Sequence, residues 1–189
     1  MSINTVLIIV AVVIIALIAW AISTYNQLVS LRNRVKNGWA QIDVQLKRRA
    51  DLIPNLVNTV KGYANHESQV FENVTKARAQ VSQTLASGSI EQRAAVESEL
   101  SRALVSVLAT AEAYPELKAN ANFIELQKEL QSIETKISYA RQFYNDVVLK
   151  LNTMVESFPS NIIASIFHFE QATYFEVEES AKAVPTVSF

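Results

Sequence analysis

An unbroken apolar run near the N-terminus constrains this chain more than any other feature. Val6 to Ile22 are seventeen consecutive apolar residues, and the first charged side chain of the 189 residues is Arg32. As an α-helix rising ~1.5 Å per residue, the run covers about 26 Å, and its uncharged flanks extend it past the ~30 Å hydrocarbon core of a bilayer. Backbone groups left unpaired in hydrocarbon are costly, so a segment there must be helical. The run predicts a transmembrane anchor over residues 1–24.

Two other interpretations of the run stay open. A buried core helix would need apolar partners on every side, and the remaining chain is too small and too patterned to supply them. A cleaved signal peptide would use the small residues of Ala19-Trp20-Ala21. However, no Lys or Arg precedes the run, and the apolar part of a signal peptide is usually only ~7–15 residues long. The residues favour a retained, single-pass anchor.

The residues after the run predict its orientation. Trp20 and Tyr25 are expected at the membrane interface, which suits amphipathic rings. Residues 32–49 carry six basic side chains and one acid. By the positive-inside rule, the N-terminus lies outside and the soluble part lies in the cytoplasm. Arg32, Arg34 and Lys36 are near enough to meet anionic headgroups, although a solvated helix face would carry the same charges.

Composition excludes several classes of protein. The chain has three Gly, no Cys and a formal net charge of −1. Scarce Gly argues against β-rich folds and phosphate-binding loops, which need positive φ angles. The missing Cys excludes disulfides and thiolate metal sites, and the balanced charge offers no case for nucleic acid.

The most regular pattern lies between Phe123 and Phe158. Apolar or aromatic residues fill every a and d position of five heptads there, which predicts a long helix packed along another long helix. An earlier stripe runs from Leu28 to Leu85, with a gap at Arg49 and with Pro54 inside it. We expect one helix over 25–86, kinked at Pro54, because the stripe resumes in phase after the proline.

Turn residues divide the rest of the chain. Gly88 and Ser89 form a C-cap and an N-cap signal, so a helix is expected over 90–112. Tyr114-Pro115 ends it, residues 116–122 are a loop in which Asn120 caps the next helix, and that helix covers 122–157. The predicted fold is all-α: a transmembrane helix followed by an elongated antiparallel helical bundle over 25–157 with coiled-coil-like packing.

The unequal helix lengths leave part of the apolar stripe without an intramolecular partner. We therefore expect self-association, or a membrane protein partner, along this stripe. The residues expected to form it are Trp39, Leu46, Ile53, Leu126, Leu130, Ile133, Ile137, Tyr144 and Leu151.

The C-terminal segment, residues 158–189, is aromatic and acidic. It either folds back to cap the open end of the bundle or docks on another subunit, a membrane surface or a partner. Its acidity argues against anionic lipid as the target. The residues expected to dock are Ile162, Ile166, Phe167, Phe169, Tyr174 and Phe175.

No motif indicates chemistry. His66 and His168 are far apart in sequence, without a second His three or four residues away, so no metal site is expected. Gly occurs only at 38, 62 and 88, which excludes nucleotide-binding and nucleophile-elbow motifs. We expect no catalytic residues, no cofactor and no small-molecule substrate.

Several dispersed motifs resemble the bacterial LemA family. They are 37-NGWAQIDVQLKRRADLIPNLVNTVKGYANHE, 139-YARQFYNDVV, 158-FPSNIIASIF and 174-YFEVEESAKAVPTVSF. The resemblance covers essentially the whole chain. It implies a single-pass protein of the bacterial inner membrane with a helical, bundle-like soluble domain, and it supplies no activity and no catalytic residues.

Three functions follow as hypotheses. The clean heptads and the anchor favour a scaffold that assembles as a homo-oligomer on the bilayer. The aromatic, acidic tail favours an adaptor for another membrane system, such as a protease or a signalling kinase. An enzyme has the least support.

Overall fold

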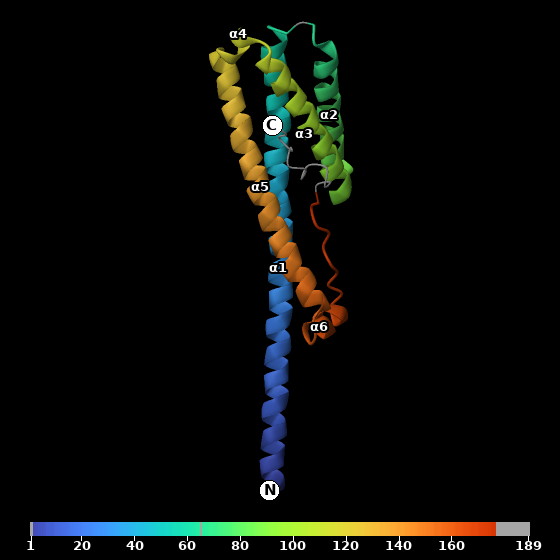
Figure 1. Ribbon diagram of the computed structural model, residues 1–189. Helices are drawn as coiled ribbons and strands as arrows, with labels where there is room; N and C mark the ends of the chain where they lie inside the picture. The colour runs from blue at the N-terminus through green and yellow to red at the C-terminus, as the bar shows by residue number, and fades with distance from the viewer. Residues whose placement is uncertain (1, 65, 177–189) are drawn as a thin grey trace, which may run out of the picture. The chain divides into compact units, whose positions relative to one another are not determined.

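The computed structural model describes residues 2–64 and 66–176, so the C-terminal segment expected at 158–189 is described only as far as residue 176. Within these ranges the chain forms six helices and no strands (Figure 1). The helices are α1 (Ile3–Lys61), α2 (Ser68–Ser87), α3 (Ile90–Glu112), α4 (Pro115–Lys118), α5 (Ala121–Glu156) and α6 (Ser160–Ile166). The predicted all-α fold with a long apolar N-terminal helix is confirmed.

The helices belong to two compact units. Unit 1 holds α1 up to Gly38 together with residues 143–173, and unit 2 holds residues 39–142 with the described residues from Tyr174 on. The long helices α1 and α5 each contribute one part to each unit.

The core of unit 1 joins α1, the end of α5 and α6. It is formed by Leu28, Leu151, Ile163, Ala164 and Phe169. Gly38 marks a close approach of the two long helices, because a Cβ atom there would lie 3.4 Å from the ring of Phe143 and from Cα of Tyr144. A glycine in the middle of a helix is unfavourable on its own. This one lets the two backbones pack closely.

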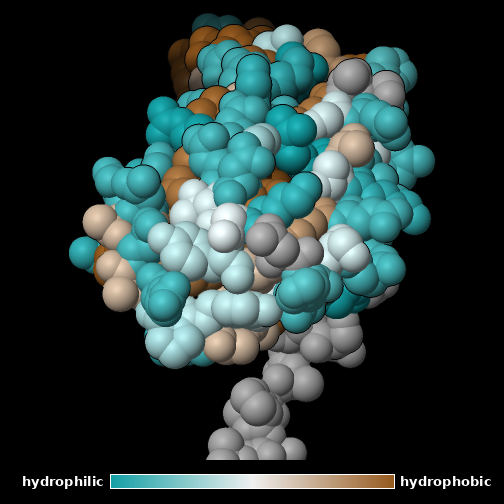
Figure 2. Space-filling view, turned by 90° about the horizontal axis from the view of Figure 1, so that it is seen from above, coloured by the Kyte–Doolittle hydropathy of each residue, from teal (hydrophilic) through white to brown (hydrophobic). Residues whose placement is uncertain are grey.

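The core of unit 2 is larger. It joins α2, α3 and α4 to the second part of α1 and the first part of α5, with members from Ala50 to Leu130. Two predicted helix starts are confirmed. The Ser89 side chain accepts from Gln92 N in a reciprocal capping box, and Phe123 N donates to Oδ1 of Asn120 at 3.1 Å. Seen from the end that carries α4, the surface is mainly hydrophilic (Figure 2).

Pro54 lies inside α1, which continues to Lys61. A proline there cannot donate to the carbonyl of Ala50, four residues earlier, and that carbonyl loses its helical partner. Arg78 on α2 supplies the missing donor, because its Nε lies 2.9 Å from the Ala50 oxygen. The expected kink stays a prediction, but the expected absence of a helix end at Pro54 is confirmed.

The helix expected over 25–86 is wrong as a single element. Helix α1 ends at Lys61, and α2 begins at Ser68. Val60 and Val74 are both fully buried in the core of unit 2, so the stripe keeps its phase although the chain turns between them. Residue periodicity reports which face is buried, and a helical hairpin with both arms on one core gives the same pattern as a continuous helix.

The loop expected at 116–122 also needs correction. Pro115–Lys118 form the short helix α4, whose Leu117 is fully buried. Proline at the first helical position favours such a turn, since its missing N–H needs no partner there. The helix expected at 90–112 has these bounds in the structure, and the one expected at 122–157 covers Ala121–Glu156.

Candidate membrane-contacting surface and buried charge cluster

The apolar segment of α1 has no cover from its own chain. An 18-residue window within Ile3–Lys61 has a mean hydropathy of 3.2 and is 0% buried. No other described helix lies against this part of α1 (Figure 1). Exposed apolar patches of this size are rare on proteins in water and mark contact with lipid or protein. The helix is long and apolar enough to cross a membrane.

The residues predicted at the membrane interface all lie on α1, and two of them contact aromatic rings that follow α6. Trp20 and Tyr25 remain 38% and 36% exposed. Tyr25 packs on the ring of Phe167 with a centroid distance of 4.7 Å, and the Arg32 guanidinium lies 5.0 Å from the ring centre of Phe169. Arg34 and Lys36 are exposed. Contact of these side chains with headgroups stays a prediction.

The stripe predicted for self-association lies in the protein's own core. Leu46, Ile53, Leu130, Ile133, Ile137, Tyr144 and Leu151 are buried, while Trp39 and Leu126 are half-buried. Any self-association in this fold must therefore use other surfaces. Coiled-coil packing of the stripe stays a prediction.

The residues predicted for tail docking divide into two groups. Phe169 and Phe175 are buried and Tyr174 is half-buried, whereas Ile162, Ile166 and Phe167 are exposed. Two further contacts tie the tail to α5. Asn152 exchanges hydrogen bonds with the backbone of Ala172, at 2.9 Å as donor and 2.8 Å as acceptor, and the Tyr144 hydroxyl donates to the Thr173 carbonyl at 2.8 Å.

A buried charge cluster in unit 2 was not predicted. Arg49 is 2% exposed and pairs with the buried Glu97 of α3. Its Nη1 also donates to Oε1 of Glu134 at 2.6 Å and to Oγ of Ser101 at 3.1 Å. Burial lowers the pKa of Arg141 below its ordinary value, nearby Arg49 lowers it further, and Glu134 opposes the change.

Sequence reasoning had one signal for this cluster, the charged residue at a core position of the stripe. A buried arginine needs carboxylate partners, because an unpaired buried charge is very costly. The partners themselves lie 48 and 85 residues further along the chain, so no local pattern could identify them. In this arrangement the carboxylates of Glu97 and Glu134 neutralise Arg49.

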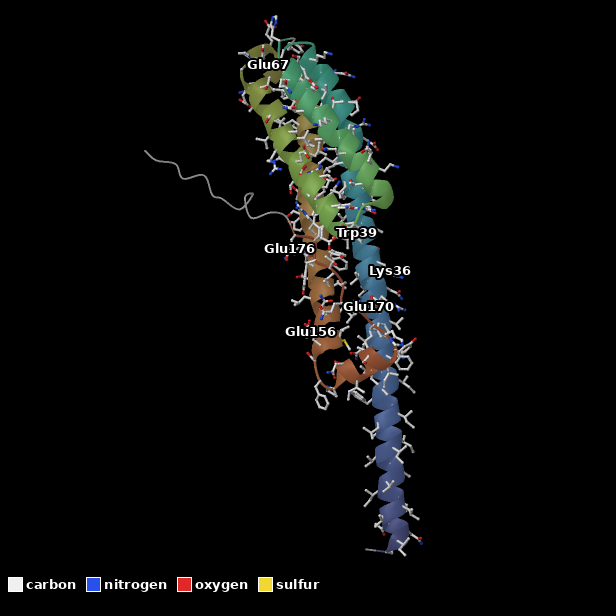
Figure 3. The ribbon with its side chains drawn as sticks, turned by 90° about the vertical axis from the view of Figure 1, so that its right-hand side faces the viewer. Lys36, Trp39, Glu67, Glu156, Glu170 and Glu176 are labelled. Atoms are coloured by element: carbon white, nitrogen blue, oxygen red, sulfur yellow. The ribbon has the colours of Figure 1, made fainter. Side chains whose placement is uncertain are left out.

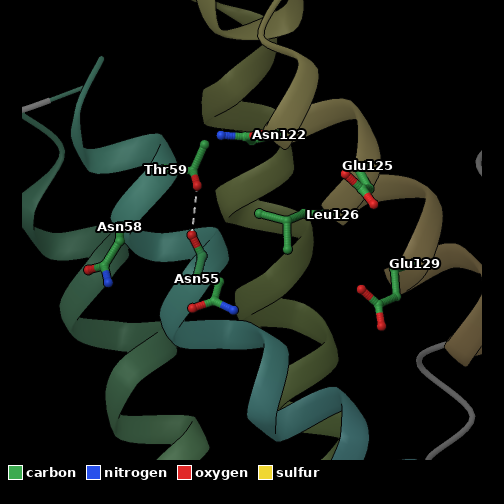
Figure 4. Close-up of a pocket in the computed structure, with 7 residues that line it drawn as sticks. All are labelled: Asn55, Asn58, Thr59, Asn122, Glu125, Leu126 and Glu129. Carbon is green, nitrogen blue, oxygen red and sulfur yellow. Dashed lines mark hydrogen bonds between the residues drawn. The ribbon is translucent and has the colours of Figure 1, made fainter.

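A shallow groove of about 390 Å³ lies between α1 and α5 in unit 2 (Figure 4). It is lined by Asn55, Asn58, Thr59, Asn122, Glu125, Leu126 and Glu129. The only hydroxyl among them, that of Thr59, already donates to the Asn55 carbonyl at 2.8 Å. Among the described residues, no group of three or more His, Cys, Asp or Glu could hold a metal ion.

An uncovered apolar helix that runs on into an all-helical bundle defines the class: this is a membrane-associated helical protein. The sequence profile of the LemA family matches residues 38–189, and the chain belongs to this family.

Curated relatives agree with this placement. The chain is 22% identical over 156 residues to Protein LemA of Metamycoplasma hominis, covering 82% of this chain and 69% of that protein. It is 22% identical over 198 residues to magnetosome protein MamQ 2 of Paramagnetospirillum magneticum, covering 93% and 72%. Magnetosome protein MamQ of Magnetospirillum gryphiswaldense is 20% identical with the same coverage.

Proposed function

We propose that the protein is a non-catalytic, membrane-anchored helical scaffold that self-associates into a homo-oligomer at the bacterial inner membrane. The observation that carries this proposal is the uncovered apolar segment of α1, which continues without a break into the core of the bundle. Such a helix holds the bundle at the bilayer surface and concentrates its copies in two dimensions. The names of the relatives given above are not enzyme names, which supports a non-catalytic role.

Self-association would use the surfaces that the fold leaves free. The predicted stripe is buried or half-buried, whereas the apolar segment of α1 is uncovered and available to a second copy. Helices in lipid associate through close van der Waals packing along one face. We therefore place the primary contact between α1 helices of neighbouring copies, within the membrane.

The proposed orientation puts the bundle in the cytoplasm. The basic residues Arg32, Arg34 and Lys36 are the first charged residues after the apolar segment, and the positive-inside rule places such residues on the cytoplasmic side. We expect activity from a C-terminally fused reporter enzyme of a kind that works only in the cytoplasm. Activity of a periplasm-specific reporter at the same position would instead show the opposite orientation.

Cysteine cross-linking tests the assembly. The chain has no Cys, so single cysteines at positions 8 to 18 can be oxidised in isolated membranes. Disulfide-linked dimers should recur every three to four positions, because one helix face meets its copy. A variant with its single cysteine in place of the exposed Lys128 on α5 is the control, and it measures the cross-linking that random collisions produce. Cross-linking no greater than this control at every position would refute a contact between α1 helices.

A second candidate is an adaptor or regulatory subunit for another membrane system. The observation that favours it is Tyr139 on α5, which is 69% exposed, since tyrosine is enriched at protein interfaces. Under this hypothesis the Tyr139→Ser variant should lose a co-purifying protein while its α1 cross-links stay unchanged. The scaffold proposal expects no such loss.

A further inference from the structure

The outer face of α6 is apolar although it is not covered. Helix α6 turns Ile163 and Ala164 into the core of unit 1, where they are 7% and 1% exposed. Ile162 and Ile166 lie four residues apart, hence on one face, and remain 47% and 61% exposed. Phe158, just before the helix, is 80% exposed, and Phe167, just after it, is 52% exposed.

The segment that contains this face also lacks acidic residues, lysine and arginine. Residues 157–169 include no Asp, Glu, Lys or Arg. Glu156 at the end of α5 and Glu170 after α6 are the first charged residues on either side (Figure 3). A surface helix of a protein surrounded by water normally carries charged or polar residues opposite its buried face. Here large apolar side chains occupy that position instead.

Contacts within unit 1 place α6 at one particular level of α1. The core that holds α6 includes Leu28 and, packed against it, Ala21. The ring of Phe167 packs against Tyr25 in a tilted arrangement, with the ring centroids 4.7 Å apart. Ala21 lies at the end of the apolar run and Tyr25 lies one turn beyond it. The exposed face of α6 therefore adjoins the end of the segment that would cross the membrane.

We propose that α6 is a second membrane contact, in which Phe158, Ile162, Ile166 and Phe167 enter the interfacial layer of the same bilayer that α1 crosses. Amphipathic helices at this depth bury their apolar face about 5–10 Å into the boundary between headgroups and acyl chains. Most of them need basic residues to reach the surface. Helix α6 needs none, because α1 already holds it at the bilayer at high effective concentration. The contact fixes the height of unit 1 above the membrane.

This inference rests on one part of the proposed function, the placement of α1 in a bilayer. Fluorescence of an environment-sensitive label tests both separately. The full chain carries the label on single cysteines at Ile14, Ile162, Ile166 or Val105, in vesicles of phosphatidylethanolamine and phosphatidylglycerol. Val105 on α3 is the matched control, an apolar residue that is 64% exposed in unit 2. Quenchers are lipids with a nitroxide either shallow or deep in the acyl chain.

Labels at Ile162 and Ile166 should shift to the blue and lose more emission to the shallow quencher than to the deep one. The label at Ile14 should respond most to the deep quencher, and the label at Val105 should respond to neither. If Ile162 and Ile166 behave like Val105, the inference is wrong although α1 is anchored. A blue shift without lipid quenching would mean that a second protein copy covers the face, which also overturns it. An unquenched Ile14 would contradict the anchor itself.

Charge substitution gives an independent reading. Ile162→Lys and Ile166→Lys change exposed side chains, so the circular dichroism spectrum should stay that of the parent protein. The labelled cysteine at Phe167 should then move toward water, with weaker shallow quenching than in the parent background. Unchanged quenching in a folded double variant would argue against insertion of α6.

Discussion

At the scale of single residues, the cluster around Arg49 buries charged side chains at an electrostatic cost. Moving a charge from water into a protein interior costs several kcal/mol, and only close partners offset it. Glu97, Glu134 and Ser101 provide these partners to Arg49. The cluster joins α1, α3 and α5 within unit 2. It therefore fixes which residues of these helices face one another, a task that interchangeable apolar side chains perform less well.

Arg49→Met should lower the stability of the protein markedly. The methionine fits the space of the arginine stem but leaves the buried Glu97 without its partner, which typically costs about 3–5 kcal/mol. For a chain of this size we expect a fall of roughly 10 °C in Tm, measured by circular dichroism on the full chain in detergent. Arg48→Met, at the exposed neighbouring position, should stay within about 0.5 kcal/mol of the parent. Equal effects of the two substitutions would show that the cluster contributes little.

At the scale of single elements, the hydrogen bond from Arg78 to the Ala50 carbonyl explains how α1 continues through Pro54. The proline removes one hydrogen bond, and a side chain from the neighbouring helix replaces it. Sequence patterns located the proline and the continuing stripe. They could not locate the compensating donor, because Arg78 belongs to a helix that the continuous-helix interpretation placed further along the same axis.

Arg78→Met should destabilise the protein by about 1–3 kcal/mol, because the Ala50 carbonyl then lacks a donor. In the Pro54→Ala background the residue at 54 regains its N–H and satisfies that carbonyl itself. The effect of Arg78→Met should therefore shrink in this background, which a double-mutant cycle of denaturation midpoints measures. Lys76→Met on the exposed side of α2 is the control. Additive effects of Arg78→Met and Pro54→Ala would show that the contribution of Arg78 to stability does not depend on the proline.

The tail contacts of α5 lead to a second prediction at this scale. Asn152 both donates to and accepts from the backbone of Ala172, and a carboxylate can only accept. Asn152→Asp should therefore release residues 167–176, seen as faster amide hydrogen exchange there with little change in the core of unit 2. Gln131→Glu, the same amide-to-carboxylate change at an exposed position of α5, should have no such effect. Unchanged amide hydrogen exchange in the Asn152→Asp variant would show that Tyr144 and Phe169, and not Asn152, hold the tail on α5.

The sequence predicted the faces of the helices better than their connections. The positions from Phe123 to Leu151 that follow a 3-4 alternation are buried or half-buried, because burial of one helix face is a local property of the pattern. The turn between Lys61 and Ser68 left no comparable mark, although Gly62 stands within it. For the tail, the sequence left open whether it folds back on the bundle or docks elsewhere, because the partners of Phe169 and Phe175, which are Arg32, Trp39 and Arg141, are distant in sequence.

At the scale of the whole molecule, the chain combines two kinds of apolar surface with different uses. The stripes of α1 and α5 beyond residue 24 are buried by the chain itself. The first part of α1 is also apolar, but no described part of the chain buries it. The two parts therefore present different surfaces: the end of unit 2 that carries α4 is mainly hydrophilic (Figure 2), whereas the N-terminal segment of α1 is apolar and exposed.

Two lysines in the middle of the apolar segment of α1 should weaken the proposed attachment of the protein to the membrane. Ile14 and Ile15 are 51% and 66% exposed, so Ile14→Lys with Ile15→Lys disturbs no packing within the chain. At the centre of a membrane helix each lysine costs about 2.5–3.5 kcal/mol on insertion scales. The double variant should therefore move from the carbonate-resistant membrane fraction to the soluble or aggregated fraction of the cell. Val44→Lys with Val105→Lys, two exposed apolar residues of unit 2, is the matched control and should leave the protein in the membrane fraction. Retention of the Ile14 and Ile15 double variant in that fraction would show that another part of the chain holds the protein at the membrane.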